Sequence, residues 1–162
     1  MQLVSHIRSL EELEAAHASK VNEVLLGHLH LSALGNLDTK TLHLLAERAN
    51  TLGMKPVLVW DTLMRDAELD KASETFKDIN INLFSTVRVL DPGAFEFVLE
   101  ESELPVQLIL RTGNHNLESI LNWIAYSPRV EKIVLSSELP KIRIAEFVKQ
   151  IPVKTEVLGL VP

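Results

Sequence analysis

Short apolar runs recur along the chain about every 25 residues, and amphipathic helical patterns separate them. Several runs, such as those at residues 56–60 and 106–110, are continuous rather than alternating. Continuous runs of Val, Leu and Ile are typical of strands that are buried on both faces, as in a parallel sheet. We predict seven strands, at residues 2–4, 23–26, 56–60, 81–84, 106–110, 132–135 and 156–161.

Helix start and stop signals lie between these runs. Ser9 and Glu12 have the spacing of a capping box, and Asp91-Pro92 is typical of an N-cap followed by the first helical residue. Gly53 is placed to end the second helix. We predict six helices, capped or opened by Ser9, by Asp38 or Thr39, and by Asp66, Asp91, Asn116 and Pro140.

Strict alternation of strands and helices predicts an α/β fold with parallel strands joined by right-handed crossovers. The two alternatives are an open doubly wound sheet and a (β/α)8 barrel. A complete barrel takes about 250 residues, so a chain of 162 residues would form an incomplete one. We favour a single TIM-barrel-like domain over residues 1–162, truncated after the seventh strand. Its exposed strand edge predicts a homodimer or a swapped arrangement through residues 155–161.

Composition narrows the function classes. Sixteen basic against 22 acidic residues give a formal charge of −6, which argues against binding to a nucleic-acid backbone. The sequence has no cysteine, so it offers no thiolate nucleophile and no cysteine ligand for zinc or an iron–sulfur cluster. We find no secretory signal, and no apolar run approaches the ~18 residues of a membrane span. We therefore expect a cytoplasmic protein without membrane association, metal or cofactor.

Candidate site residues are those that follow strands, because functional groups of parallel α/β folds gather at the strands' carboxyl ends. His28 and His30 follow the second strand, and their spacing would suit a metal if both rings faced one side. Unliganded loop histidines are the simpler interpretation. Asp61 follows the third strand, where it either accepts a hydrogen bond from substrate or caps its own loop. We take His28 and Asp61 as candidate substrate-binding residues. After the fourth strand we expect Ser85, Thr86 and Arg88.

The densest polar cluster follows the fifth strand, at residues 111–116. Arg111 at a strand end needs a carboxylate or a ligand as partner. Glu138, in the loop after the sixth strand, is the natural partner of Arg111 or His115. We predict that Arg111 and Asn114 bind substrate and that Glu138 and His115 perform acid–base catalysis. The alternative is a salt bridge that only closes the end of the barrel.

Two segments resemble a known family closely. Residues 112–120, Thr-Gly-Asn-His-Asn-Leu-Glu-Ser-Ile, look like a "TGNHNLEAI" segment, and residues 133–140 resemble a "VLSRELSL" strand and loop. Residues 23–27, 53–60 and 87–94 match other strands of the same family more weakly. By these segments the chain resembles the collagenase-like peptidase family U32 over essentially its whole length.

The resemblance implies a barrel-type fold and the family's historical label of protease. Relatives take part in hydroxylation of RNA bases or of a quinone precursor, some with cysteine-bound iron–sulfur clusters, which this cysteine-free chain cannot ligate. The chain departs from the family at residues 30–34, where an "FSAR"-like segment is replaced, so a substrate contact through that Arg does not carry over. We expect the barrel region of an enzyme acting on a small molecule or a peptide. The alternative is a non-catalytic module that binds a ligand or a partner on the same fold.

Overall fold

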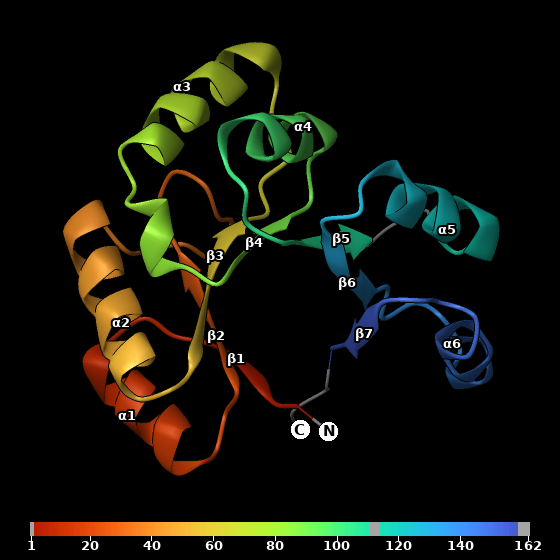
Figure 1. Cartoon of the computed structure of the whole chain (residues 1–162), viewed down its shortest axis with the longest axis horizontal. Coiled ribbons are helices and arrows are strands. Elements are labelled where there is room, and N and C mark those ends of the chain that lie inside the picture. The colour runs from red at the N-terminus through yellow and green to blue at the C-terminus, as the bar shows by residue number, and fades with distance from the viewer. Residues whose placement is uncertain (1, 111–113, 159–162) are drawn as a thin grey trace. The chain divides into compact units, whose positions relative to one another are not determined.

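The computed structural model describes residues 2–110 and 114–158 (Figure 1). These residues form seven strands and six α-helices in strict alternation, with one added 3-10 helix. The chain divides into two compact units, Met1–Leu104 and Pro105–Pro162. The predicted alternation of strands and helices is confirmed.

The first unit is a four-stranded parallel sheet whose strand order follows the chain. Its register places Leu25 opposite Val57 and Val59 opposite Arg88. Figure 1 shows the four helices on one side of the strands. The elements are β1 (Val4–His6), α1 (Leu10–Ala18), β2 (Glu23–Gly27), α2 (Thr39–Thr51), β3 (Lys55–Trp60), α3 (Asp66–Lys77), η1 (Ile81–Leu83), β4 (Thr86–Val89) and α4 (Pro92–Glu101).

The second unit continues the same repeat with three parallel strands in chain order. A doubly wound sheet reverses its strand order at a switch point, whereas both units progress in one direction, as the strands of a TIM barrel do. The fold is therefore an incomplete TIM-barrel-like (β/α) repeat, as predicted. Its elements are β5 (Val106–Leu110), α5 (Leu117–Tyr126), β6 (Val130–Leu135), α6 (Lys141–Val148) and β7 (Lys154–Val157).

Polar side chains start the helices largely where the sequence predicts them. The side chains of Ser9, Asp38, Asp91 and Asn116 each accept a backbone N–H from the first turn of the helix they cap. Gly53 follows α2 with φ +71, the left-handed conformation that favours glycine at a helix end. The prediction of Asp66 as a cap is wrong by one residue: Arg65 is the N-cap, and its N–H donates to Glu68 Oε2 at 2.9 Å.

The predicted fourth strand is misplaced. Residues 81–83 form the 3-10 helix, and β4 is Thr86–Val89, so Thr86 and Arg88 lie within the strand instead of following it. The apolar run at residues 81–84 looks like a strand, while the true strand has polar residues buried on one face. The ends of the outer predicted strands also shift: β1 begins at Val4, and β7 spans Lys154–Val157. Residues 159–161 of the predicted last strand lie outside the described residues.

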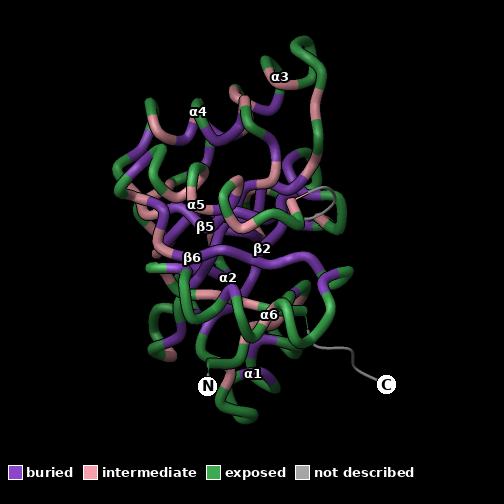
Figure 2. Tube along the Cα trace, turned by 90° about the vertical axis from the view of Figure 1, so that its right-hand side faces the viewer, coloured by how far each residue is buried: buried purple, intermediate pink, exposed green. Residues whose placement is uncertain are grey.

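The core of the first unit lies on both faces of the sheet. On the helix side, the ring of Trp60 packs against Phe76 of α3 and Phe97 of α4, with centroids 5.5 and 5.9 Å apart. Val57 and Val59 alternate with Trp60 along β3, so they point to the other face, where they cluster with Leu25. Figure 2 shows β2 as a continuously buried segment. None of the helices in the described part of the chain is long and apolar enough to cross a membrane.

Candidate functional site

Two loops of the second unit carry the predicted acid–base residues. Asn114 and His115 precede α5, after β5, and Glu138 lies between β6 and α6. β5 and β6 are parallel neighbours, with Leu110 opposite Leu135 at their ends. The carboxyl ends of adjacent parallel strands meet at one edge of a sheet, about 4.8 Å apart. The two loops therefore emerge side by side.

The structure brings His115 and Glu138 together. His115 Nε2 lies 3.1 Å from Glu138 Oε2. The side chains are 43% and 55% exposed, so a ligand can reach both. A carboxylate that contacts an imidazole can accept a proton from water, and the imidazole can donate or accept one in turn.

Ser136 is a third member of this cluster, and it is not among the site residues predicted from the sequence. It follows β6 directly and is only 4% exposed. Its Oγ lies 3.4 Å from His115 Nε2 and accepts the backbone N–H of Glu138 at 3.2 Å. The available signal in the sequence was position: Ser136 is the first polar residue after the buried strand, two residues before Glu138.

Asn114 is the other predicted residue of this edge that the structure describes, and its side chain bonds to the helix that follows. Asn114 Oδ1 accepts a hydrogen bond from Ser119 Oγ at 3.3 Å, which ties the loop to the first turn of α5. Arg111 lies outside the described residues. Within the described parts of the chain, no group of three or more His, Asp or Glu side chains is arranged to hold a metal ion.

His28, in the first unit, is buried, with 3% of its surface exposed. Its Nδ1 accepts the backbone N–H of His30 at 3.2 Å, so Nε2 carries the ring proton of the neutral imidazole. Nε2 then donates to Thr39 Oγ1, 3.3 Å away. Burial lowers the pKa of His28, the nearby His30 and His43 lower it further, and Asp38 opposes them.

Asp61 is also buried and binds the neighbouring loop. Its Oδ1 accepts the backbone N–H of Ala33 at 2.9 Å, and the adjacent Thr62 Oγ1 donates to the carbonyl of Leu31 at 3.1 Å. Asp61 and His28 thus both fasten residues 28–38, the loop between β2 and α2. Their predicted substrate-binding role stays a prediction. The alternative of a capping Asp61 anticipated a structural hydrogen bond, but not that it would reach Ala33 of the neighbouring loop.

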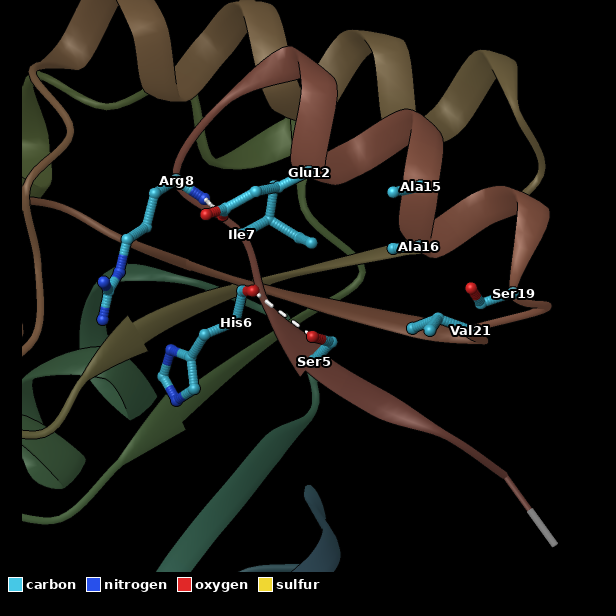
Figure 3. A pocket seen from close by; sticks show the side chains of 9 residues that line it. All are labelled: Ser5, His6, Ile7, Arg8, Glu12, Ala15, Ala16, Ser19 and Val21. Atoms are coloured by element: carbon cyan, nitrogen blue, oxygen red, sulfur yellow. Dashed lines mark hydrogen bonds between the residues drawn. The ribbon is translucent and has the colours of Figure 1, made fainter. Parts of the chain in front are cut away.

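A shallow pocket of about 530 Å³ lies elsewhere in the first unit (Figure 3). It runs along β1 and the adjacent face of α1, where the Arg8 N–H donates to Glu12 Oε2 at 2.7 Å. None of the five predicted site residues that the structure describes lines it. The pocket also has ionisable side chains, those of His6, Arg8 and Glu12. The candidate site remains the edge after β5 and β6, because the contact between His115 and Glu138 joins loops that follow two adjacent strands.

Comparison with known protein families shows the family to which the chain belongs. The model of Peptidase family U32 matches residues 8–160. The chain belongs to this family. No match was found among curated protein sequences.

Solved structures share the fold. The U32 peptidase Mk0906 is 12% identical, with a TM-score of 0.72 over 97% of this chain and 68% of that chain. Phosphoribosyl anthranilate isomerase from Thermococcus kodakaraensis is 16% identical, with a TM-score of 0.67 over 99% of this chain and 79% of that chain. At these identities the similarity shows the fold alone. The family resemblance predicted from residues 112–120 and 133–140 is confirmed.

Proposed function

We propose that this U32-family chain contributes the catalytic edge of a peptide-bond hydrolase, formed by the loops after β5 and β6. The observation that carries the proposal is the 3.1 Å contact between His115 Nε2 and Glu138 Oε2. The two residues come from loops that follow different strands, at the edge where parallel α/β folds place their sites. Membership of a family described as peptidases supports this reaction class.

The proposed reaction uses Glu138 as general base and His115 as general acid. Glu138 takes a proton from a water molecule as the water oxygen attacks the peptide carbonyl carbon. The C–N bond then breaks, and the charged imidazole of His115 gives its Nε2 proton to the leaving amine. Protonated Glu138 returns a proton to Nε2 across their contact. One water is consumed, and one carboxylic acid and one amine are released.

The loop after β5 would bind the substrate. Arg111 follows β5 directly in the sequence, and a guanidinium suits a carbonyl oxygen or a terminal carboxylate. Asn114, one residue before His115, offers an amide that can donate to the peptide backbone. These assignments give the site an acid–base pair and a polar substrate contact on adjacent loops.

A second candidate function is a non-catalytic module that binds a ligand or partner at the same edge. The exposure of His115 and Glu138, 43% and 55%, favours this alternative, because exposed ion pairs are common on surfaces without a catalytic role. The two functions differ in one respect: a module would bind its ligand without turning it over.

The test is release of primary amines from gelatin and from a mixed peptide library by the purified chain. Glu138→Gln is the informative variant because it keeps the shape and removes the base. Glu146→Gln is its control: Glu146 forms an exposed ion pair with Arg143 on α6, at 3.0 Å. We expect wild type and Glu146→Gln to hydrolyse peptide and Glu138→Gln to lose at least about 100-fold. Peptide binding with no hydrolysis by wild type would support the module instead.

A further inference from the structure

Ser136 is the buried member of the His115–Glu138–Ser136 cluster. It is 4% exposed and directly follows β6, whereas the side chains of both partners are about half exposed. Its hydroxyl contacts the His115 ring and the backbone of Glu138. A buried hydroxyl in this place links both acid–base residues to the end of the strand.

The two contacts at His115 Nε2 differ in what they can do. Glu138 Oε2 at 3.1 Å is an acceptor when ionised, so it is a good partner only while Nε2 carries a proton. Ser136 Oγ at 3.4 Å can accept from a protonated Nε2 or donate its own hydrogen to a bare one. Accepting the Glu138 N–H uses one lone pair of the hydroxyl and leaves its hydrogen available.

We propose that Ser136 is a positioning residue that holds the His115 ring in place in both protonation states of Nε2. This inference rests on the proposed function, in which Nε2 loses a proton to the leaving amine and regains one from Glu138. At the moment when Nε2 is bare, Glu138 carries the proton taken from water and has not yet returned it, and the Ser136 hydroxyl can donate its hydrogen to Nε2 during that interval. The ring then stays aligned for the return of the proton.

The first measurement is independent of turnover. Long-range ¹H–¹⁵N NMR reads the two ring nitrogens of His115 separately, in wild type, Ser136→Ala and Ser136→Thr. Ser137→Ala is the matched control, because Ser137 is the exposed neighbouring serine. We expect Ser136→Ala to shift Nε2 more than Nδ1, Ser136→Thr to restore the wild-type Nε2 resonance, and Ser137→Ala to leave both unchanged.

The second measurement is steady-state hydrolysis of peptide by the same variants. Loss of one hydrogen bond that aligns a catalytic group predicts a fall in kcat of about tenfold with KM unchanged, and recovery in Ser136→Thr. Thermal melting identifies a variant that fails to fold, and the threonine variant then carries the test.

The outcomes separate the inference from the proposed function. An unchanged Nε2 resonance in folded Ser136→Ala overturns the positioning role, whatever the turnover. A shifted Nε2 resonance in a protein that hydrolyses no peptide supports the contact to His115 and overturns the proposed function. A fall in kcat that the threonine variant does not recover, with an unshifted Nε2, assigns Ser136 to the loop structure alone.

Discussion

The backbone N–H of His30 donates to Nδ1 of His28, 3.2 Å away, within a loop that closes on itself. This bond needs a lone pair on Nδ1, so it exists only while the buried imidazole is neutral. The carbonyl of His28 also accepts the N–H groups of Leu31 and Ser32, each at 3.0 Å. Protonation of the His28 ring would therefore break a hydrogen bond that holds residues 28–38 in their conformation.

The first prediction is a loss of stability in acid that depends on His28. Its folded-state pKa lies below the ordinary value of 6.5, mainly because of burial. The unfolded chain therefore binds the proton more readily, and the free energy of unfolding falls as pH drops below 6.5 towards the folded pKa. Urea unfolding at several pH values between about 7.5 and 5.5 should show a shallower decline in His28→Gln than in wild type.

His17→Gln is the control for this experiment, because His17 is exposed in the last turn of α1. It should keep the wild-type dependence of stability on pH. Equal slopes for wild type and His28→Gln would show that His28 does not cause the acid sensitivity.

The second prediction compares the cost of adding a side chain at two glycines, one restricted by close neighbours and the other by its backbone conformation. A Cβ at Gly35 would lie 2.7 Å from the carbonyl carbon of His28, whereas one at Gly53 would meet nothing within 4 Å. Gly35→Ala should therefore destabilise the protein by about 3 kcal/mol through overpacking. Gly53→Ala should cost about 1–2 kcal/mol, from its positive φ alone. Chemical denaturation ranks the two, and a smaller cost at Gly35 would contradict the close approach of the loop.

The third prediction is that Asp61 anchors the β2–α2 loop through Ala33. Asp61→Ala removes the acceptor at 2.9 Å and should destabilise the protein by about 1–3 kcal/mol. Asp61→Asn retains an acceptor oxygen and should cost less. Amide hydrogen exchange at Ala33 should accelerate in the alanine variant. If exchange there is equally fast in all three proteins, the anchoring role is wrong.

Local signals made much of the fold predictable. Short polar caps such as Ser9 and Asp91 act through bonds within one helical turn, so sequence alone locates them. β4 was missed because its Arg88 and Thr86 are buried polar residues, only 3% and 2% exposed, which an apolarity criterion rejects. Which buried polar residues a sheet accommodates depends on partners far away in sequence, which periodicity does not contain.

Part of the candidate site was also predictable from the sequence. Parallel neighbouring strands bring the loops after them together, so the contact of Glu138 with His115 followed from topology. The contact of Ser136 with His115 was not predictable, because the direction of each side chain decides which of the nearby hydroxyls reaches the ring. The same limit applies to His28, whose ring turns inward to His30 and Thr39.

The fourth prediction contrasts two ion pairs of the second unit. Lys132 Nζ lies 3.4 Å from Glu156 Oε2, and these side chains are only 4% and 14% exposed. Glu156→Gln removes a carboxylate that contacts a buried ammonium and should cost about 3 kcal/mol. Glu138→Gln breaks an exposed pair and should change the free energy of unfolding by less than about 1 kcal/mol. Thermal melts that rank the two variants in the opposite order would make the Glu138 contact structural.

The measurement that tests the central claim most directly is a double-mutant cycle in peptide hydrolysis with His115→Gln, Glu138→Gln and the double variant. If the two residues pass a proton across their 3.1 Å contact, either single variant disables the unit. The double variant should then lose no more kcat/KM than the more damaging single one. Losses that multiply independently, or single variants that keep wild-type activity in a protein that hydrolyses peptide, would contradict an acid–base pair at this edge.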